Sequence, residues 1–115
     1  MTSYDSGDIV LVRYPFTDLN ALKKRPAIVL SQRTYSDRYG DLVVMPLTSR
    51  EETDNSLALS EWRAAGLLKP TWVKPVIGTL ILGLVDKQLG KLAVVDDQCI
   101  RAALSLLLDI RWTKS

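Results

Sequence analysis

Three short segments carry the side chains best suited to chemistry. Lys23-Lys24-Arg25-Pro26 places a permanently charged guanidinium, whose planar fork fits a phosphate, just before an apolar run. Leu47-Thr48-Ser49 offers two hydroxyls that can donate to phosphate oxygens, and Tyr14-Pro15-Phe16 offers rings that stack on unpaired bases. Each segment also has an ordinary structural explanation: a solvated hairpin, a turn after a strand, or aromatic cover at the end of a barrel.

The residue types that are missing narrow the chemistry further. The chain has no histidine, which excludes Ser-His-Asp and Cys-His catalysis and histidine-ligated metals. Its single cysteine, Cys99, excludes an intramolecular disulfide and cysteine-rich zinc sites. No glycine-rich phosphate loop follows a strand, and Asp96-Asp97 is interpreted as a helix start rather than a metal site. We therefore expect no metal and no cofactor.

Charge is distributed unevenly along the chain. The net charge is only +2, but residues 10–50 hold seven bases and three acids, a net charge of +4. Composition alone favours a solvated basic face over an anion site. Residues 1–8 lack the features of a signal peptide, and the most apolar stretches, 76–85 and 102–110, are too short to span a bilayer. With one cysteine, the sequence predicts a cytoplasmic protein without membrane contact.

The elements that must position these residues are mostly short strands. A chain of 115 residues suits one domain, and we expect residues 1–115 to form it. Short apolar runs bounded by Gly and Pro predict about six strands, at residues 9–14, 26–31, 42–47, 57–59, 71–73 and 79–85. Residues 34–40 are expected to form a turn-rich link, 86–90 a turn, and 91–94 a last short strand.

One convincing helix ends the chain. Ile100, Ala103, Leu104 and Leu107 follow helical spacing, and Asp96 is a suitable N-cap, so we predict a helix from Asp97 to Arg111. Short strands followed by a terminal helix predict a small, strongly bent antiparallel β-barrel rather than a parallel βαβ fold.

Taken together, these segments resemble the MazF/PemK (Kid) family of toxins from type II toxin–antitoxin systems. Gly7-Asp8-Ile9-Val10-Leu11-Val12 resembles the first strand of that family, and Lys24-Arg25-Pro26 with Ala27-Ile28-Val29-Leu30-Ser31 its second. Residues 43–49, ending in Thr-Ser, are similar to the third strand, residues 59–70 to the middle of a PemK-like subgroup, and residues 89–92 with the terminal helix to its end.

The resemblance implies a mainly β (α+β) fold, a small SH3-like antiparallel β-barrel with a C-terminal α-helix, usually as a homodimer. It implies a sequence-specific endoribonuclease that cuts single-stranded RNA, leaving a 2′,3′-cyclic phosphate and a 5′-hydroxyl, and that a cognate antitoxin protein inhibits. Arg25 and Thr48 occupy the positions that carry catalysis in active members. For substrate binding, the expected residues are Lys23, Lys24 and Lys74 on flanking phosphates, Ser49, and Tyr14 or Phe16 stacked on a base.

The sequence also departs from the family. Members of the Kid branch carry Arg-x-Asp where this chain has Val73-Lys74-Pro75-Val76, so the arginine is replaced by lysine and no carboxylate follows. The general base stays open among a carboxylate, a tyrosine, a lysine, the arginine itself and water. Two other functions remain open. One is a CcdB-like toxin that binds gyrase, because such toxins end in a tryptophan-containing tail and Trp112 near this C-terminus is superficially similar. The other is a binding module without catalysis.

Overall fold

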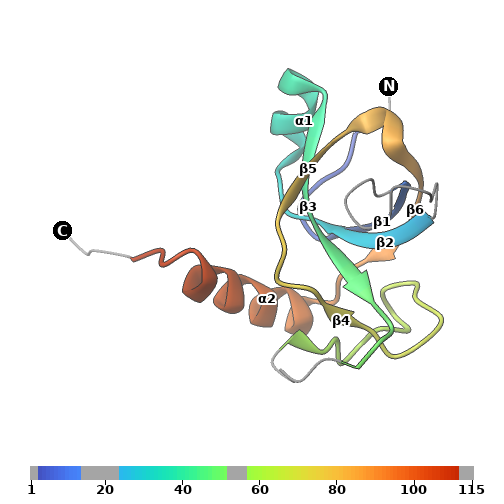
Figure 1. Cartoon of the computed structure of the whole chain (residues 1–115), viewed down its shortest axis with the longest axis vertical. Helices are drawn as coiled ribbons and strands as arrows, with labels where there is room; N and C mark the ends of the chain where they lie inside the picture. Colours follow the sequence, from blue (N-terminus) through green and yellow to red (C-terminus); the bar gives the residue numbers. More distant parts are fainter. Residues whose placement is uncertain (1–2, 14–23, 52–56, 112–115) are drawn as a thin grey trace.

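Six antiparallel strands form one bent sheet in the computed structural model, which describes residues 3–13, 24–51 and 57–111 (Figure 1). The strands lie in the order β4-β3-β2-β1-β6, and β5 pairs with β3 beside β4. Within the described residues no hydrogen-bonded pair of strands closes the sheet into a complete barrel. The bounds are Asp8–Arg13 for β1, Lys24–Val29 for β2, Asp41–Thr48 for β3, Trp72–Val73 for β4, Gly78–Ile81 for β5 and Val85–Lys91 for β6.

Both faces of the sheet are apolar, because β1, β2 and β3 alternate between two hydrophobic layers. The inner layer lies on the concave face, which β5 and the 3₁₀ turn η2 (Leu82–Leu84) help to enclose. It consists of Tyr4, Val10, Val12, Ala27, Val29, Leu42, Val44 and Leu80.

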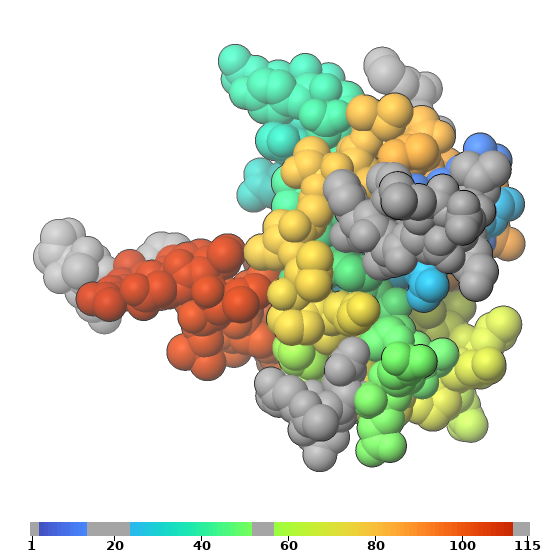
Figure 2. All heavy atoms as spheres, viewed as in Figure 1, coloured from blue at the N-terminus to red at the C-terminus, as the bar shows by residue number. Residues whose placement is uncertain are grey.

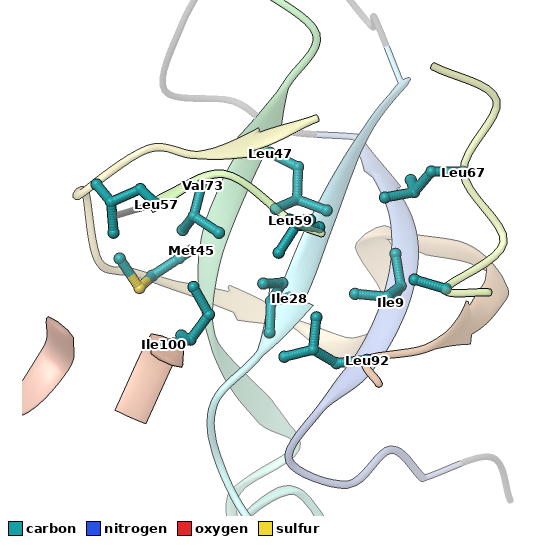
Figure 3. Close-up of a cluster of buried hydrophobic side chains, with 11 residues drawn as sticks. Ile9, Ile28, Met45, Leu47, Leu57, Leu59, Leu67, Val73, Leu92 and Ile100 are labelled. Carbon is teal, nitrogen blue, oxygen red and sulfur yellow. The ribbon is translucent and has the colours of Figure 1, made fainter. Parts of the chain in front are cut away.

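The outer layer lies on the opposite face, under residues 57–73 and the helix α2 (Val94–Leu107). Figure 3 shows side chains from the sheet, from the covering segment and from α2 pointing toward one another. It consists of Ile9, Ile28, Met45, Leu47, Leu57, Leu59, Ala65, Leu67, Val73, Leu92 and Ile100. Two adjacent residues such as Ile9 and Val10 therefore belong to different layers.

The C-terminal helix is confirmed, but its bounds and its N-cap differ from the prediction. It begins at Val94 after Ala93, and Asp96 lies inside the first turn, where a negative charge still suits the helix dipole. It ends at Leu107, because Asp109 adopts a left-handed φ of 52° and turns the chain away. Figure 2 shows the end of α2 projecting from the body of the molecule.

The sequence interpretation missed one helix and one strand. Residues 34–40 do not form a link: α1 spans Arg33–Tyr39 and ends at Gly40 in the left-handed region. The predicted turn at 86–90 is wrong, because these residues continue β6 and pair with β1. The predicted strand at 91–94 is also wrong, since β6 ends at Lys91 and α2 begins at Val94.

Two expected strands are shorter than predicted. The strand expected at 79–85 ends at Ile81, and η2 follows it. The strand expected at 57–59 is reduced to one bridge between Ala58 and Trp72. In the described part of the chain, no helix is long and apolar enough to cross a membrane.

Candidate active site

Arg25 and Thr48 lie at the same end of two paired strands. The last pair of the β2–β3 ladder at this end joins Ala27 to Pro46, and Arg25 and Thr48 each lie two residues beyond it. Arg25 also pairs with Val12 of β1, and Thr48 with Trp72 of β4. Both residues therefore lie where the β2–β3 ladder ends.

Both residues line a groove of about 840 Å³. The groove lies beside the outer layer, with which it shares Leu47, Leu67 and Leu89. β6, β1, β2 and the end of β3 supply the sheet side, and residues from 66 to 71 supply the opposite side. Its lining is Leu11, Lys24, Arg25, Pro26, Leu47, Thr48, Ser49, Gly66, Leu67, Leu68, Lys69, Thr71, Lys87 and Leu89.

The groove is strongly basic for a protein of nearly balanced charge. Of its described lining residues, four carry a positive charge, Lys24, Arg25, Lys69 and Lys87, and none carries a carboxylate. Lys24 alone of these has a carboxylate partner among the described residues, with Nζ 3.3 Å from Oδ2 of Asp86. The arrangement favours a polyanionic ligand, because lysines attract phosphate as point charges and arginine binds it through paired donors.

Arg25, which lines the groove, has a side-chain donor that no described residue satisfies. Its Nε is buried and has no hydrogen-bond partner among the described residues. A buried donor without a partner costs about 1–3 kcal/mol, so an acceptor that enters the groove is favoured. Oγ1 of Thr48 accepts the backbone N–H of Arg50 at 3.1 Å, which leaves the hydroxyl hydrogen available to donate.

The wall formed by residues 66–71 is fixed by two contacts with distant parts of the chain. The backbones of residues 65–66 and 89–90 approach so closely that a Cβ on Gly66 would lie 2.1 Å from the carbonyl oxygen of Leu89, and one on Gly90 would lie 2.2 Å from that of Ala65. The turn at Ser60 and Glu61 lies just before this wall in the sequence. The buried carboxylate of Asp96 accepts hydrogen bonds from both backbone N–H groups of this turn and from the Ser60 hydroxyl, at 2.8–2.9 Å. The start of α2 thus holds the turn that leads into the wall.

The structure brings together four of the eight predicted site residues. Arg25, Thr48, Lys24 and Ser49 line the groove. Lys74 is exposed after β4 and is not among the residues that line it. Tyr14, Phe16 and Lys23 lie outside the described residues, as does Trp112.

Lys69 and Lys87 are the groove residues that the sequence interpretation missed. Neither belongs to a motif, and Lys87 was assigned to a turn that proves to be strand β6. Only the pairing of β6 with β1, which puts Lys87 beside Leu11, reveals its place in the groove. Among the described residues, no group of three or more His, Cys, Asp or Glu side chains is placed to hold a metal ion.

Comparison with known proteins identifies the class to which this fold and groove belong. The model for "PemK-like, MazF-like toxin of type II toxin-antitoxin system" matches residues 5–108. The chain therefore belongs to this family of toxins, as its sequence motifs indicated. No curated protein sequence matches it significantly.

Solved structures show the same fold at low sequence identity. A MazE-MazF complex from Deinococcus radiodurans matches with a TM-score of 0.78 and 20% identity, over 96% of this chain and 100% of that one. An endoribonuclease in complex with its cognate antitoxin, from a mycobacterial species, matches with a TM-score of 0.75 and 20% identity, over 98% of this chain and 100% of that one. The Mycobacterium tuberculosis toxin MazF-mt6 matches with a TM-score of 0.75 and 18% identity, over 91% of this chain and 99% of that one. The predicted mainly β fold with a C-terminal helix is thus confirmed.

Proposed function

We propose that this toxin is a sequence-specific, metal-independent endoribonuclease that cleaves single-stranded RNA in the basic groove. One observation carries the proposal: Arg25 and Thr48 line one groove with four cations and no described carboxylate. Similar solved structures include an endoribonuclease bound to its cognate antitoxin and a MazE-MazF complex, which supports the same function. Its target would be messenger RNA in the cytoplasm.

In the proposed reaction the 2′-oxygen of one nucleotide attacks the adjacent phosphorus. The bond from phosphorus to the 5′-oxygen of the next nucleotide breaks, which leaves a 2′,3′-cyclic phosphate and a 5′-hydroxyl. Negative charge builds on the non-bridging oxygens, and the Arg25 guanidinium is suited to stabilise it because its donors match two oxygens at once. The Thr48 hydroxyl adds a neutral donor on the opposite strand.

The reaction also needs one group to take the proton from the 2′-hydroxyl and another to protonate the leaving oxygen. The described groove residues include no carboxylate, and the chain contains no histidine. In this part of the groove the remaining candidates for the base are a lysine, the arginine itself and water.

The proposal is tested by incubating the pure protein with a long single-stranded RNA in the presence of EDTA. We expect cleavage by the parent, at least a hundredfold slower cleavage by Arg25→Ala, and little rescue by Arg25→Lys, because a point charge cannot replace the fork. Thr48→Ala should slow cleavage less. Arg13→Ala, at the exposed end of β1 outside the groove, is the matched control and should cleave at the parent rate.

Thermal melts of the same variants separate chemistry from folding. Arg25→Ala should change stability by about 1 kcal/mol or less, since Ala27, Ile28 and Val29 supply the apolar content of β2. Parent protein that binds RNA or gyrase without cutting RNA would overturn the nuclease in favour of a binding module or a CcdB-like toxin. Activity that needs added Mg²⁺ would overturn the metal-independent mechanism.

We also propose that the toxin is a homodimer and binds a cognate antitoxin with an acidic, apolar tail. The dimer is supported by large exposed apolar side chains on β5 and on the end of α2: Ile81 is 60% and Leu106 85% exposed. Between them a groove of about 530 Å³ runs past Val43, Ile77 and Leu108. Sedimentation should show a dimer at micromolar concentration, and Ile81→Lys with Leu106→Glu should shift it to a 12.8 kDa monomer.

A further inference from the structure

The groove runs across the strands rather than along them. Lys87 of β6 pairs with Leu11 of β1, which pairs with Pro26 of β2, and Leu47, one residue beyond the last β2–β3 pair, lines the groove next. These residues form the sheet side of the groove. Lys87 supplies a positive charge at the β6 end, and Leu11, Pro26 and Leu47 are apolar.

The opposite wall follows the same direction. Gly66 packs against Leu89 of β6, whereas Trp72, directly after the wall, pairs with Thr48 of β3. Residues 66–71 therefore pass from β6 at one end to the end of β3 at the other. Lys69 lies on this wall and lines the groove.

Two of the groove's lysines are free to bind an anion. Lys69 and Lys87 form no ion pair with any described carboxylate, whereas Lys24 pairs with Asp86. Lys91, four residues beyond Lys87 on β6, lies 3.9 Å from Asp8 and does not line the groove. Strand spacing puts Lys87 about 10 Å from the β2 position occupied by Pro26, a distance that a short stretch of single strand spans.

We propose that single-stranded RNA crosses β6, β1, β2 and β3 at right angles to the strands, with Lys87 and Lys69 each holding a phosphate beside the scissile one at Arg25 and Thr48. Leu11 and Pro26, which are half-buried, form the apolar surface on which a base rests. This inference rests on the proposed nuclease function and adds the path of the substrate and two residues that position it.

The test measures how binding depends on salt, with a 2′-O-methyl RNA of mixed sequence and about 12 nucleotides, which cannot be cleaved because its 2′-oxygen is blocked. Each phosphate contact with a single strand contributes about 0.7 to the slope of log K against log salt. We expect Lys69→Ala and Lys87→Ala each to lower the slope by about this amount and to weaken binding several-fold. Lys87→Arg should keep the parent slope, because the charge remains.

Two exposed cations outside the groove serve as matched controls: Lys91 on β6 and Arg13 at the end of β1. Their alanine variants should keep the parent slope. An RNA strand that instead ran parallel to the strands would leave the groove at the end of β2 and pass Arg13, because Arg13 pairs with Lys24 there. A lowered slope for Arg13→Ala with no change for Lys87→Ala would overturn the transverse path.

Other outcomes separate this inference from the function on which it rests. If the parent cleaves RNA but Lys69→Ala and Lys87→Ala keep the parent's salt-dependence slope, the proposed RNA path is wrong and the proposed nuclease function is not affected. If all the lysine variants lower the slope equally, binding is diffuse and the path is also wrong. If the parent neither binds the oligonucleotide nor cleaves RNA, the proposed function itself fails.

Discussion

The inner and outer apolar layers of the sheet are built in different ways. The inner layer is drawn mainly from strands that pair with each other, so strand alternation supplies most of its side chains. The outer layer needs residues 57–73 and α2 to cover it, and these are held by contacts between residues far apart in sequence. The groove shares side chains with the outer layer, so the candidate site depends on the layer with the more distant constraints.

The largest effect should follow from Gly90→Ala. The new Cβ would meet the backbone carbonyl of Ala65 at 2.2 Å, and neither backbone can move away cheaply. We expect a loss of about 4 kcal/mol or more in the free energy of unfolding, measured by denaturant titration. Gly83→Ala is the control, since its Cβ would meet only the Ile81 side chain at 4.0 Å.

Hydrogen exchange on Gly90→Ala would sharpen the comparison between layers. Protection should fall first in residues 57–73, while β1 and β2 keep theirs. Simultaneous loss of protection throughout the sheet would show that the two layers form one cooperative unit.

A pair of cavity variants comes next. Leu42→Ala removes a fully buried side chain from the inner layer, and Ile100→Ala one that is 3% exposed from the outer layer. Each should cost about 2–4 kcal/mol. At a temperature where both are folded, Ile100→Ala should cleave RNA more slowly than the parent and Leu42→Ala should not. Equal rates in the two variants would contradict the link between the outer layer and the groove.

Asp96→Ala should have a somewhat smaller effect on stability. It removes the acceptor of three hydrogen bonds from Ser60 and Glu61, and charged acceptors of this kind contribute about 2–3 kcal/mol. Asp97→Ala is the neighbouring control: it loses an exposed pair with Arg101 worth about 0.5 kcal/mol. Similar melting temperatures for the two variants would show that Asp96 does not hold the turn.

The smallest effect is expected at Asp5, beside the inner-layer residue Tyr4. The N–H groups of Ser6 and then of Arg33 donate to its carboxylate and hold the pKa of Asp5 below its ordinary value. A lowered pKa in the folded state means that the charged form stabilises the protein above that ordinary value, and that this contribution declines as pH falls from there through the lowered pKa. Asp5→Asn should therefore lower the Tm slightly at neutral pH and by less near pH 3, about one unit below the usual carboxyl pKa. An equal change at both pH values would contradict this.

An element could be predicted from the sequence when its own apolar residues stabilise it, and not when it is held mainly by other parts of the chain. β1, β2 and β3 were predictable because their alternating apolar residues are themselves the core. Helix α1 was not, because Ser36 is its only buried residue and it carries no apolar stripe. β6 was not, because its exposed polar residues give no apolar alternation and its backbone is held by pairing with β1.

Sequence alone determined the strands that carry Arg25 and Thr48 and the family to which the chain belongs, because those features are local motifs of a few residues. Only the tertiary structure decided that Arg25 and Thr48 line one groove, that Lys69 and Lys87 join them, and that Lys74 does not line it. Asp96 likewise looked like a helix cap, yet it binds a turn 35–36 residues away. The physical reason is that register and long-range hydrogen bonds depend on how separate segments pack, which no single segment encodes.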